Sequence, residues 1–192
     1  MNSDAGDPFF FGYGSLVNRR THTYAEAYGA RVVGWRRVWR QTHMRDTAFL
    51  SVEPAPGVEI EGLIALVPGG DWTALDRREH GYDRLALGAG LAHSATRPVS
   101  AHIYAIPAHR TAEPGARQPI LLSYLDVVVQ GYLTEFGEAG VERFLATTHG
   151  WDVGVLDDRA RPRYPRAQDL GGRDRGLVDA ALAALGVDVR TP

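Results

Sequence analysis

Apolar and polar residues alternate through the first part of the chain in a way that predicts β-strands. The run Phe-Phe-Phe-Gly-Tyr-Gly-Ser-Leu at 9–16 is an apolar strand that ends in a glycine-containing loop. Residues 31–40, 58–67 and 99–106 are rich in β-branched and aromatic side chains, and we expect a strand in each. A short helix is expected over 72–80, after a Pro-Gly-Gly sequence that ends the preceding strand.

Helical periodicity replaces this alternation after a loop rich in proline and glycine at 107–119. Residues 120–136 carry an apolar stripe at helical spacing, and further helices are expected over 139–147 and 175–185. Strands followed by helices, without regular strand–helix alternation, indicate an α+β fold rather than a doubly wound parallel sheet. We predict a small mixed β-barrel or strongly curved sheet with flanking helices.

Length and composition are typical of one globular domain. A chain of 192 residues with 44% hydrophobic residues can bury a substantial core, so we expect one domain over 1–192 with a helical C-terminal part at about 119–187. The net charge of -2 gives no general attraction to nucleic acid or anionic lipid, and no stretch is apolar enough to span a membrane. The polar, acidic start at 1–7 differs from a secretory signal, so we expect a cytoplasmic location without nucleic-acid or membrane partners.

Several kinds of chemistry are excluded because the residues they need are missing. The sequence contains neither cysteine nor lysine, which excludes thiol nucleophiles, thiolate metal sites, a P-loop lysine and a Schiff base. A GxGxxG pattern begins at Gly12 and Gly14, but Val17 replaces its third glycine. The seven histidines lack metal-ligand spacing, and the surroundings of Ser15 differ from a GxSxG hydrolase elbow. We therefore expect no metal and no organic cofactor.

The loop at 12–16 is the first candidate for ligand binding. Its glycines expose backbone N–H groups that can hold an anion or a carbonyl oxygen. Asn18 is a plausible N-cap, and we expect a helix from there through Tyr24 and Ala27, with the loop at the positive end of its dipole. A simple turn without a ligand is an equally good interpretation of the loop taken alone.

The second candidate is the carboxyl group of Glu79. On a helix over 72–80, Trp72, Leu75 and Glu79 lie on one face, so the carboxyl shares an apolar stripe. Burial favours the protonated carboxyl and a nearby arginine such as Arg78 favours the charged one, a balance that suits proton exchange near neutral pH. A simple ion pair between Glu79 and a neighbouring arginine is the alternative interpretation.

Two arginine-rich segments each allow a functional and a structural interpretation. Residues 31–40 combine arginine with tryptophan, as RNA-binding surfaces do, but the overall charge favours a half-buried strand whose arginines point to water. Residues 159–166 contain arginines that could bind a substrate carboxylate in a bidentate manner. Such a segment is more often a solvated surface loop, so it is not included in the predicted site.

Two motifs together resemble the γ-glutamylcyclotransferase family. Phe-Gly-Tyr-Gly-Ser-Leu at 11–16 resembles the signature loop of these enzymes, and Leu-Asp-x-x-Glu at 75–79 resembles their catalytic segment. Gly-Trp-Arg-Arg-Val-Trp at 34–39 and the Arg-Glu pair before Gly-Tyr at 78–82 are most similar to the ChaC-type, glutathione-degrading branch. His80 departs from the amino-acid-specific branch, which usually has glycine after its catalytic glutamate.

The resemblance implies a fold, an activity and a set of site residues. The fold is a small β-barrel with flanking helices, and the activity is cofactor-independent release of 5-oxoproline from a γ-glutamyl peptide or amine. Glu79 is implied as the acid/base, and the γ-glutamyl group is implied to bind Tyr13, Gly14, Ser15 and Leu16. Tyr124 resembles a substrate-contacting tyrosine, although it equally fits a core aromatic on a helix face.

Such a reaction needs few enzyme groups. The substrate's own α-amine attacks its γ-carbonyl and closes a five-membered ring, so no enzyme nucleophile is required. One carboxyl can accept the ammonium proton and return it to the leaving amine, while N–H groups near Gly14 and Ser15 orient the substrate. A non-catalytic module on the same fold, binding a small ligand or a protein partner, is the alternative.

Overall fold

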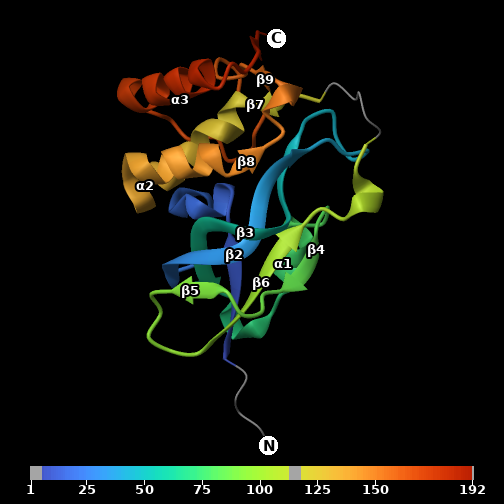
Figure 1. Ribbon diagram of the computed structural model, residues 1–192, viewed down its shortest axis with the longest axis vertical. Coiled ribbons are helices and arrows are strands. Elements are labelled where there is room, and N and C mark those ends of the chain that lie inside the picture. Colours follow the sequence, from blue (N-terminus) through green and yellow to red (C-terminus); the bar gives the residue numbers. More distant parts are fainter. Residues whose placement is uncertain (1–5, 113–117, 192) are drawn as a thin grey trace, which may run out of the picture.

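The fold is a mixed α+β arrangement built on one large curved sheet (Figure 1). The computed structural model describes residues 6–112 and 118–191. Its helices are α1 (Thr73–Arg78), α2 (Leu122–Ala146) and α3 (Gly172–Ala184). The strands are β1 (Asp7–Gly12), β2 (Ala27–Arg40), β3 (Phe49–Leu66), β4 (Asp83–Ala86), β5 (Leu91–His93), β6 (Val99–Ala105), β7 (Ile120–Leu121), β8 (Thr148–His149), β9 (Val155–Leu156) and β10 (Val189–Arg190).

The large sheet is open, which confirms the curved-sheet form of the prediction rather than the closed barrel. Its strand order is β4-β6-β1-β3-β2-β5, with β8 paired to β2. The longest pairing joins β2 and β3 in antiparallel register from Ala27 opposite Ala65 to Arg40 opposite Phe49. A second, three-stranded sheet has the order β10-β9-β7.

Strand β1 is buried on both faces of the sheet. It pairs antiparallel with β3 on one side and parallel with β6 on the other. Phe9 and Phe11 belong to the main core under α2, whereas Phe10 belongs to a smaller core that α1 covers with Leu75. A strand between two cores reads as a continuous apolar run, which explains the three consecutive phenylalanines. The loop that follows β1 therefore starts from a rigid position.

The C-terminal helices largely follow the predicted pattern. The helices expected over 120–136 and 139–147 form one element, α2, which is interrupted at Gly137 by a backbone conformation outside the helical region (φ 68°, ψ −172°). The third helix corresponds to α3. The predicted loop at 107–119 contains a 3-10 turn at Ala108–Arg110, and its residues 113–117 lie outside the described residues. Among the residues described, no helix has the length and apolar character needed to cross a bilayer.

The helix expected from Asn18 through Ala27 is wrong. Two short 3-10 turns, Ser15–Val17 and Arg19–Thr21, follow the loop, and Ala27 already belongs to β2. Asn18 does accept a hydrogen bond from the Arg20 N–H, but its amide group donates to α2, at the carbonyl of Val127 and the side chain of Gln130. These contacts hold the segment against α2, so the chain turns back to the sheet instead of continuing as a helix. The loop consequently has no long helix dipole behind it.

The expectation that the arginines of 31–40 all point to water is also wrong, because Arg37 is only 1% exposed. The pairing of β2 with β3 shifts register between Val33 and Trp35, around Gly34 at φ 93°. Such a bulge changes which positions face the core, since side chains alternate along a strand. Before the bulge Val32 is buried, and after it Arg37 is buried.

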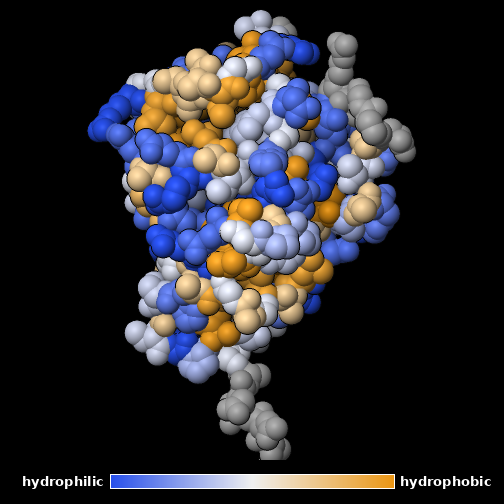
Figure 2. Space-filling view, in the orientation of Figure 1, coloured by the Kyte–Doolittle hydropathy of each residue, from blue (hydrophilic) through white to orange (hydrophobic). Residues whose placement is uncertain are grey.

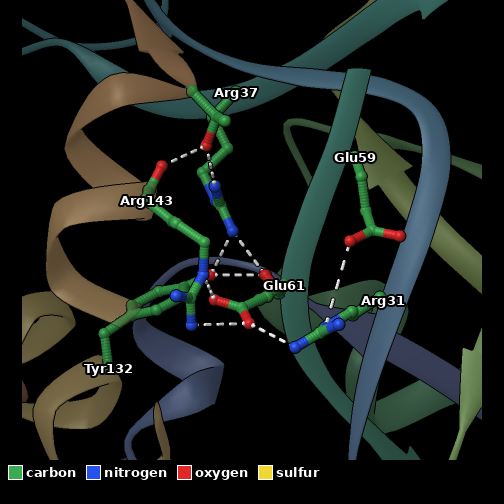
Figure 3. Close-up of polar contacts among 7 residues, drawn as sticks. Arg31, Arg37, Glu59, Glu61, Tyr132 and Arg143 are labelled. Carbon is green, nitrogen blue, oxygen red and sulfur yellow. Dashed lines mark hydrogen bonds and ion pairs between the residues drawn. The ribbon is translucent and has the colours of Figure 1, made fainter. Parts of the chain in front are cut away.

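The buried guanidinium of Arg37 is held by several groups between the sheet and α2 (Figure 3). It donates to the Tyr132 hydroxyl at 2.6 Å, to the Thr147 hydroxyl at 2.8 Å and to the Glu61 carbonyl. It also lies 5.0 Å from the centroid of the Tyr132 ring. The neighbouring Glu61 carboxylate binds Arg143 through two 2.9 Å hydrogen bonds. Two strands and α2 are thereby connected through polar groups inside an otherwise apolar core.

The molecular surface mixes both kinds of residue. Figure 2 shows several separate hydrophobic patches among hydrophilic residues on the face seen in Figure 1. This pattern is ordinary for a folded protein surface, where a large share of the exposed area is apolar.

Replacing Arg37 by methionine should destabilise the fold strongly. The change removes the donors of buried carbonyl and hydroxyl groups, and each unsatisfied buried group costs about 1–3 kcal/mol, so we expect a total loss of about 2–4 kcal/mol. Equilibrium urea unfolding measures this loss. The matched control is Arg36→Met, because the partly exposed Arg36 pairs with Glu53 at 3.6 Å and a surface ion pair contributes only about 0–1 kcal/mol. Equal losses in the two variants would contradict the role given to Arg37.

Candidate functional site

The loop after β1 and the side chain of Glu79 line the same small cavity, which has a volume of about 40 Å³. Residues 11–16 form one wall. The rest of the cavity wall comes from segments that are distant in sequence: Leu50 of β3, Glu79 and Tyr82 just after α1, Tyr104 of β6 and Tyr124 of α2. The structure thus brings together Tyr13, Gly14, Ser15, Leu16, Glu79 and Tyr124, the six residues predicted for the site.

Tyr13 holds the loop in place through both its side chain and its backbone. Its hydroxyl donates to the Tyr104 carbonyl at 2.6 Å. Its carbonyl accepts from the Arg37 Nε at 3.2 Å and from the Tyr132 hydroxyl at 2.9 Å. The loop is therefore fixed at one residue to β6, β2 and α2 together, and the buried Arg37 reaches the cavity indirectly through this carbonyl.

Gly14 is needed because Tyr124 packs directly over it. A Cβ atom at Gly14 would lie 2.7 Å from the Tyr124 hydroxyl oxygen and 3.3 Å from a methyl group of Leu50. The first distance is too short for a normal contact, so any larger residue would displace Tyr124. This close approach supports the placement of Tyr124 in the site, because its hydroxyl end points at the loop rather than only into the helix core.

Glu79 lies at the C-terminal end of α1, where its N–H donates to the Leu75 carbonyl at 2.9 Å. Leu75 is buried in the smaller core with Phe10, which fixes the orientation of this short helix. The Glu79 side chain is 18% exposed, and its Oε1 lies 3.2 Å from the Arg78 Nε. Both interpretations of the sequence are therefore present at once: the carboxyl lines the cavity and also pairs with an arginine.

The protonation of Glu79 reflects competing influences. Burial raises the pKa of its carboxyl above the usual value, while the positive charges of Arg78 and Arg166 and a hydrogen bond from Arg78 lower it, and the net direction is upward. A carboxyl with a raised pKa gains and loses a proton more readily near neutral pH than an exposed one. The site therefore contains a group able to act as both acid and base.

Tyrosine hydroxyls surround this carboxyl. Burial raises the pKa values of Tyr13, Tyr82 and Tyr124 well above the ordinary tyrosine value, so these side chains keep their protons at neutral pH. The Tyr82 hydroxyl donates to the Leu50 carbonyl at 2.9 Å, which ties it to β3. Neutral hydroxyls that line a cavity are suited to hydrogen-bond a polar substrate.

Sequence reasoning missed Tyr82 and Tyr104 as site residues. Tyr82 lies three residues after Glu79, in the same Arg-Glu and Gly-Tyr motif at 78–82, so its proximity in sequence is an available signal. Tyr104 has no such signal in the sequence, because it reaches the cavity only through the pairing of β6 with β1 and β4. Its hydroxyl donates to Asp76 of α1 at 2.5 Å, which links the helix to the sheet.

A second, larger cavity of about 170 Å³ adjoins the first, and both are lined by Ser15, Glu79, Tyr82 and Tyr124. Its remaining walls include Arg45, Phe49 and the segment Tyr164–Arg166. The Tyr164 ring packs edge-on against Tyr124, with centroids 5.0 Å apart. The arginine-rich segment 159–166, left out of the predicted site, therefore reaches the site with its last three residues.

The two ends of this segment have different roles. Arg159 binds the Asp126 carboxylate through two 2.7 Å hydrogen bonds, and these contacts anchor the segment to α2. Arg166 instead lines the second cavity. Within 6–112 and 118–191, no group of three or more histidine, aspartate or glutamate side chains has the arrangement of a metal site.

Comparison with solved structures identifies the fold. The protein resembles an uncharacterized protein from Homo sapiens with a TM-score of 0.57 and 14% identity, over 89% of this chain and 97% of the other. It resembles YkqA from Bacillus subtilis with a TM-score of 0.57 and 14% identity, over 76% of this chain and 56% of the other. A structure described as gamma-glutamyl cyclotransferase gives a TM-score of 0.53 at 14% identity, over 90% of this chain and 98% of the other. At such low identity these likenesses concern the fold alone.

Comparison at the sequence level identifies the family. No curated protein sequence matches the chain significantly. The sequence pattern of the family described as "Gamma-glutamyl cyclotransferase, AIG2-like" matches residues 10–143, well over half of the chain. The matched region contains the loop after β1, the Glu79 segment and Tyr124. Because this match spans more than half of the chain and includes the candidate site, the chain belongs to the γ-glutamyl cyclotransferase, AIG2-like family.

Proposed function

We propose that the protein releases 5-oxoproline from a γ-glutamyl peptide or amine, with Glu79 as the general acid and base. The observation that carries this proposal is the shared cavity of the Glu79 carboxyl and the Gly14–Ser15 loop. Family membership supports the reaction class. The motifs most similar to the ChaC-type branch make glutathione the first substrate to test.

In the proposed mechanism the γ-glutamyl group occupies the smaller cavity with its α-ammonium facing Glu79. The ionised carboxyl accepts a proton from this ammonium, whose reference pKa is about 8. The freed amine attacks the γ-carbonyl carbon, forming the ring C–N bond. Glu79 donates its proton to the leaving nitrogen as the bond from that carbon to the leaving nitrogen breaks. The ionised carboxyl then takes the second proton from the new ring nitrogen and passes it to the released amine, which departs as an ammonium, and the lactam is left neutral.

Hydrogen-bond donors around the cavity would stabilise the oxyanion that forms during ring closure. Such donors act most strongly when they are held in place and shielded from water. The loop is fixed at Tyr13 by Arg37 and Tyr132, and the buried Tyr124 hydroxyl lies against Gly14. We assign substrate binding to Tyr13, Gly14, Ser15, Leu16 and Tyr124.

The substitution Glu79→Gln should abolish most of the turnover. It retains the size of the side chain but cannot accept or deliver the proton, and general acid–base catalysis contributes about 10²–10⁴-fold in rate. Release of 5-oxoproline from glutathione and from a panel of γ-glutamyl amino acids and amines measures the effect. Glu142→Gln is the matched control, because Glu142 is exposed on α2 away from the cavity, and we expect unchanged rates.

The outcomes of this experiment separate catalysis from simple binding. Wild-type turnover that persists in Glu79→Gln would remove the assigned role. Substrate binding without any 5-oxoproline from the wild-type protein would instead favour the alternative of a non-catalytic binding module.

The pH dependence of kcat/KM should have an acid limb set by Glu79. Activity requires the ionised carboxyl, so kcat/KM rises as pH increases through the pKa of Glu79, which burial raises. Arg78 lowers that pKa, so Arg78→Gln should move the acid limb to higher pH. Arg77→Gln is the control, because Arg77 is exposed and does not line either cavity. An acid limb that stays in place in Arg78→Gln would argue against Glu79 as the titrating group.

The substitution Gly14→Ala should lower kcat/KM by about tenfold or more, since small displacements of catalytic groups have effects of this size or larger. The added methyl group would lie 2.7 Å from the Tyr124 hydroxyl and push it away from the loop. The matched control is Gly88→Ala, where a Cβ meets no atom within 4 Å. Full activity in Gly14→Ala would show that the contact between the loop and Tyr124 is dispensable.

A further inference from the structure

The second cavity has the composition of a binding site for an anionic group. Three arginines, Arg45, Arg78 and Arg166, line it together with one acidic side chain, Glu79. Arg78 is paired with Glu79 at 3.2 Å. Among the described residues, neither Arg45 nor Arg166 has a carboxylate within 4 Å. Two exposed arginines that line the cavity are therefore without a carboxylate partner and are available to a ligand.

Neighbouring side chains position Arg45 and the segment that carries Arg166. The Arg45 guanidinium lies 5.5 Å from the centroid of the Phe49 ring, and Phe49 packs edge-on against Tyr82. Arg166 follows Tyr164, whose ring packs against Tyr124. Arg163, earlier in the same segment, binds the Asp46 carboxylate at 2.7 Å, which joins the segment to the loop that carries Arg45. The two arginines thus come from connected segments.

The position of this cavity relative to Glu79 indicates which part of a substrate it would hold. The smaller cavity is lined by the whole loop after β1, whereas the second cavity is lined by only one residue of that loop, Ser15. Glu79 lies at the junction of the two. In the proposed reaction the acid/base faces both the α-nitrogen and the leaving nitrogen, so a γ-glutamyl group in the first cavity directs the leaving group into the second.

We propose that Arg45 and Arg166 bind a carboxylate of the leaving group, so that the enzyme prefers γ-glutamyl amino acids or peptides over neutral γ-glutamyl amines. This inference rests on the proposed function. Arginine matches a carboxylate with two parallel hydrogen bonds, and these charge-assisted bonds are among the stronger ones in proteins. The aromatic rings of Phe49, Tyr82, Tyr124 and Tyr164 supply the apolar walls for the rest of the leaving group.

The test compares two substrates that differ only in this charge, γ-glutamyl-alanine and γ-glutamyl-alaninamide. The readout is the ratio of their kcat/KM values, measured as 5-oxoproline release. We expect the wild-type protein to favour the acid by about tenfold, the ratio that a single good charged contact provides. In the double variant Arg45→Gln/Arg166→Gln this ratio should fall close to one. The ratio removes any effect that the lost charges have on Glu79 itself, because both substrates share it.

Arg161→Gln is the matched control, because Arg161 is exposed in the same segment and lies outside the cavity, and its ratio should equal that of the wild type. A wild-type ratio near one would overturn the proposal. A double variant that loses activity equally on both substrates would also overturn it, since the arginines would then bind the carboxylate common to both, that of the glutamyl group.

Failure of the proposed function is distinguishable from failure of this inference. If the wild-type protein releases 5-oxoproline from neither substrate, calorimetric titration measures how tightly it binds each one. The carboxylate site predicts tighter binding of the acid than of the amide, with the difference lost in the double variant. Equal binding of the two compounds would overturn the site independently of turnover.

Discussion

The contact between the Arg37 guanidinium and the Tyr13 carbonyl is the constraint on which the site depends. The guanidinium comes from β2, the carbonyl from the loop after β1, and the same group also binds Glu61 of β3 and Tyr132 of α2. A charged group inside a core is costly unless it is well hydrogen-bonded, so this arrangement is stable only when all of these segments are in register. The loop geometry is therefore linked to the correct pairing of the whole sheet.

The Glu79 carboxyl has the opposite character, because competing influences act on its pKa. Burial disfavours its charge, while Arg78 and Arg166 favour it. A stronger ion pair would fix the carboxyl in its ionised form, and a fully apolar pocket would fix it as the neutral acid. The partial pairing seen here suits a group that must hold a proton briefly and release it again. In the proposed mechanism the loop supplies a rigid wall, and Glu79 at the end of the short helix α1 exchanges the proton.

The sequence predicted those parts of the fold and site that local patterns determine. The apolar run at Phe9–Phe11, the helical stripe of α2 and the glycine loop are all visible as patterns, as is the short helix α1 that ends just before Glu79. The burial of Arg37 was not visible, because it follows from a bulge at Gly34 that reverses the inward and outward positions of β2. The helix expected after Asn18 failed because contacts with α2, more than a hundred residues away, override local capping. Tyr104 and Arg166 reach the site through long-range pairing and packing, which no local pattern encodes.

The charged side chains are distributed unevenly over the protein. The chain as a whole is slightly acidic, with a net charge of -2, yet its second cavity gathers three arginines around one glutamate. Elsewhere, arginines such as Arg19, Arg97 and Arg159 are paired with carboxylates at 2.5–2.7 Å. Arg45 and Arg166, by contrast, have no acidic partner within 4 Å among the described residues, and both line the second cavity. A cavity with low-dielectric aromatic walls strengthens the positive potential of such side chains. An anionic leaving group would be drawn to the side of Glu79 opposite the loop, which is where the departing amine must receive its proton.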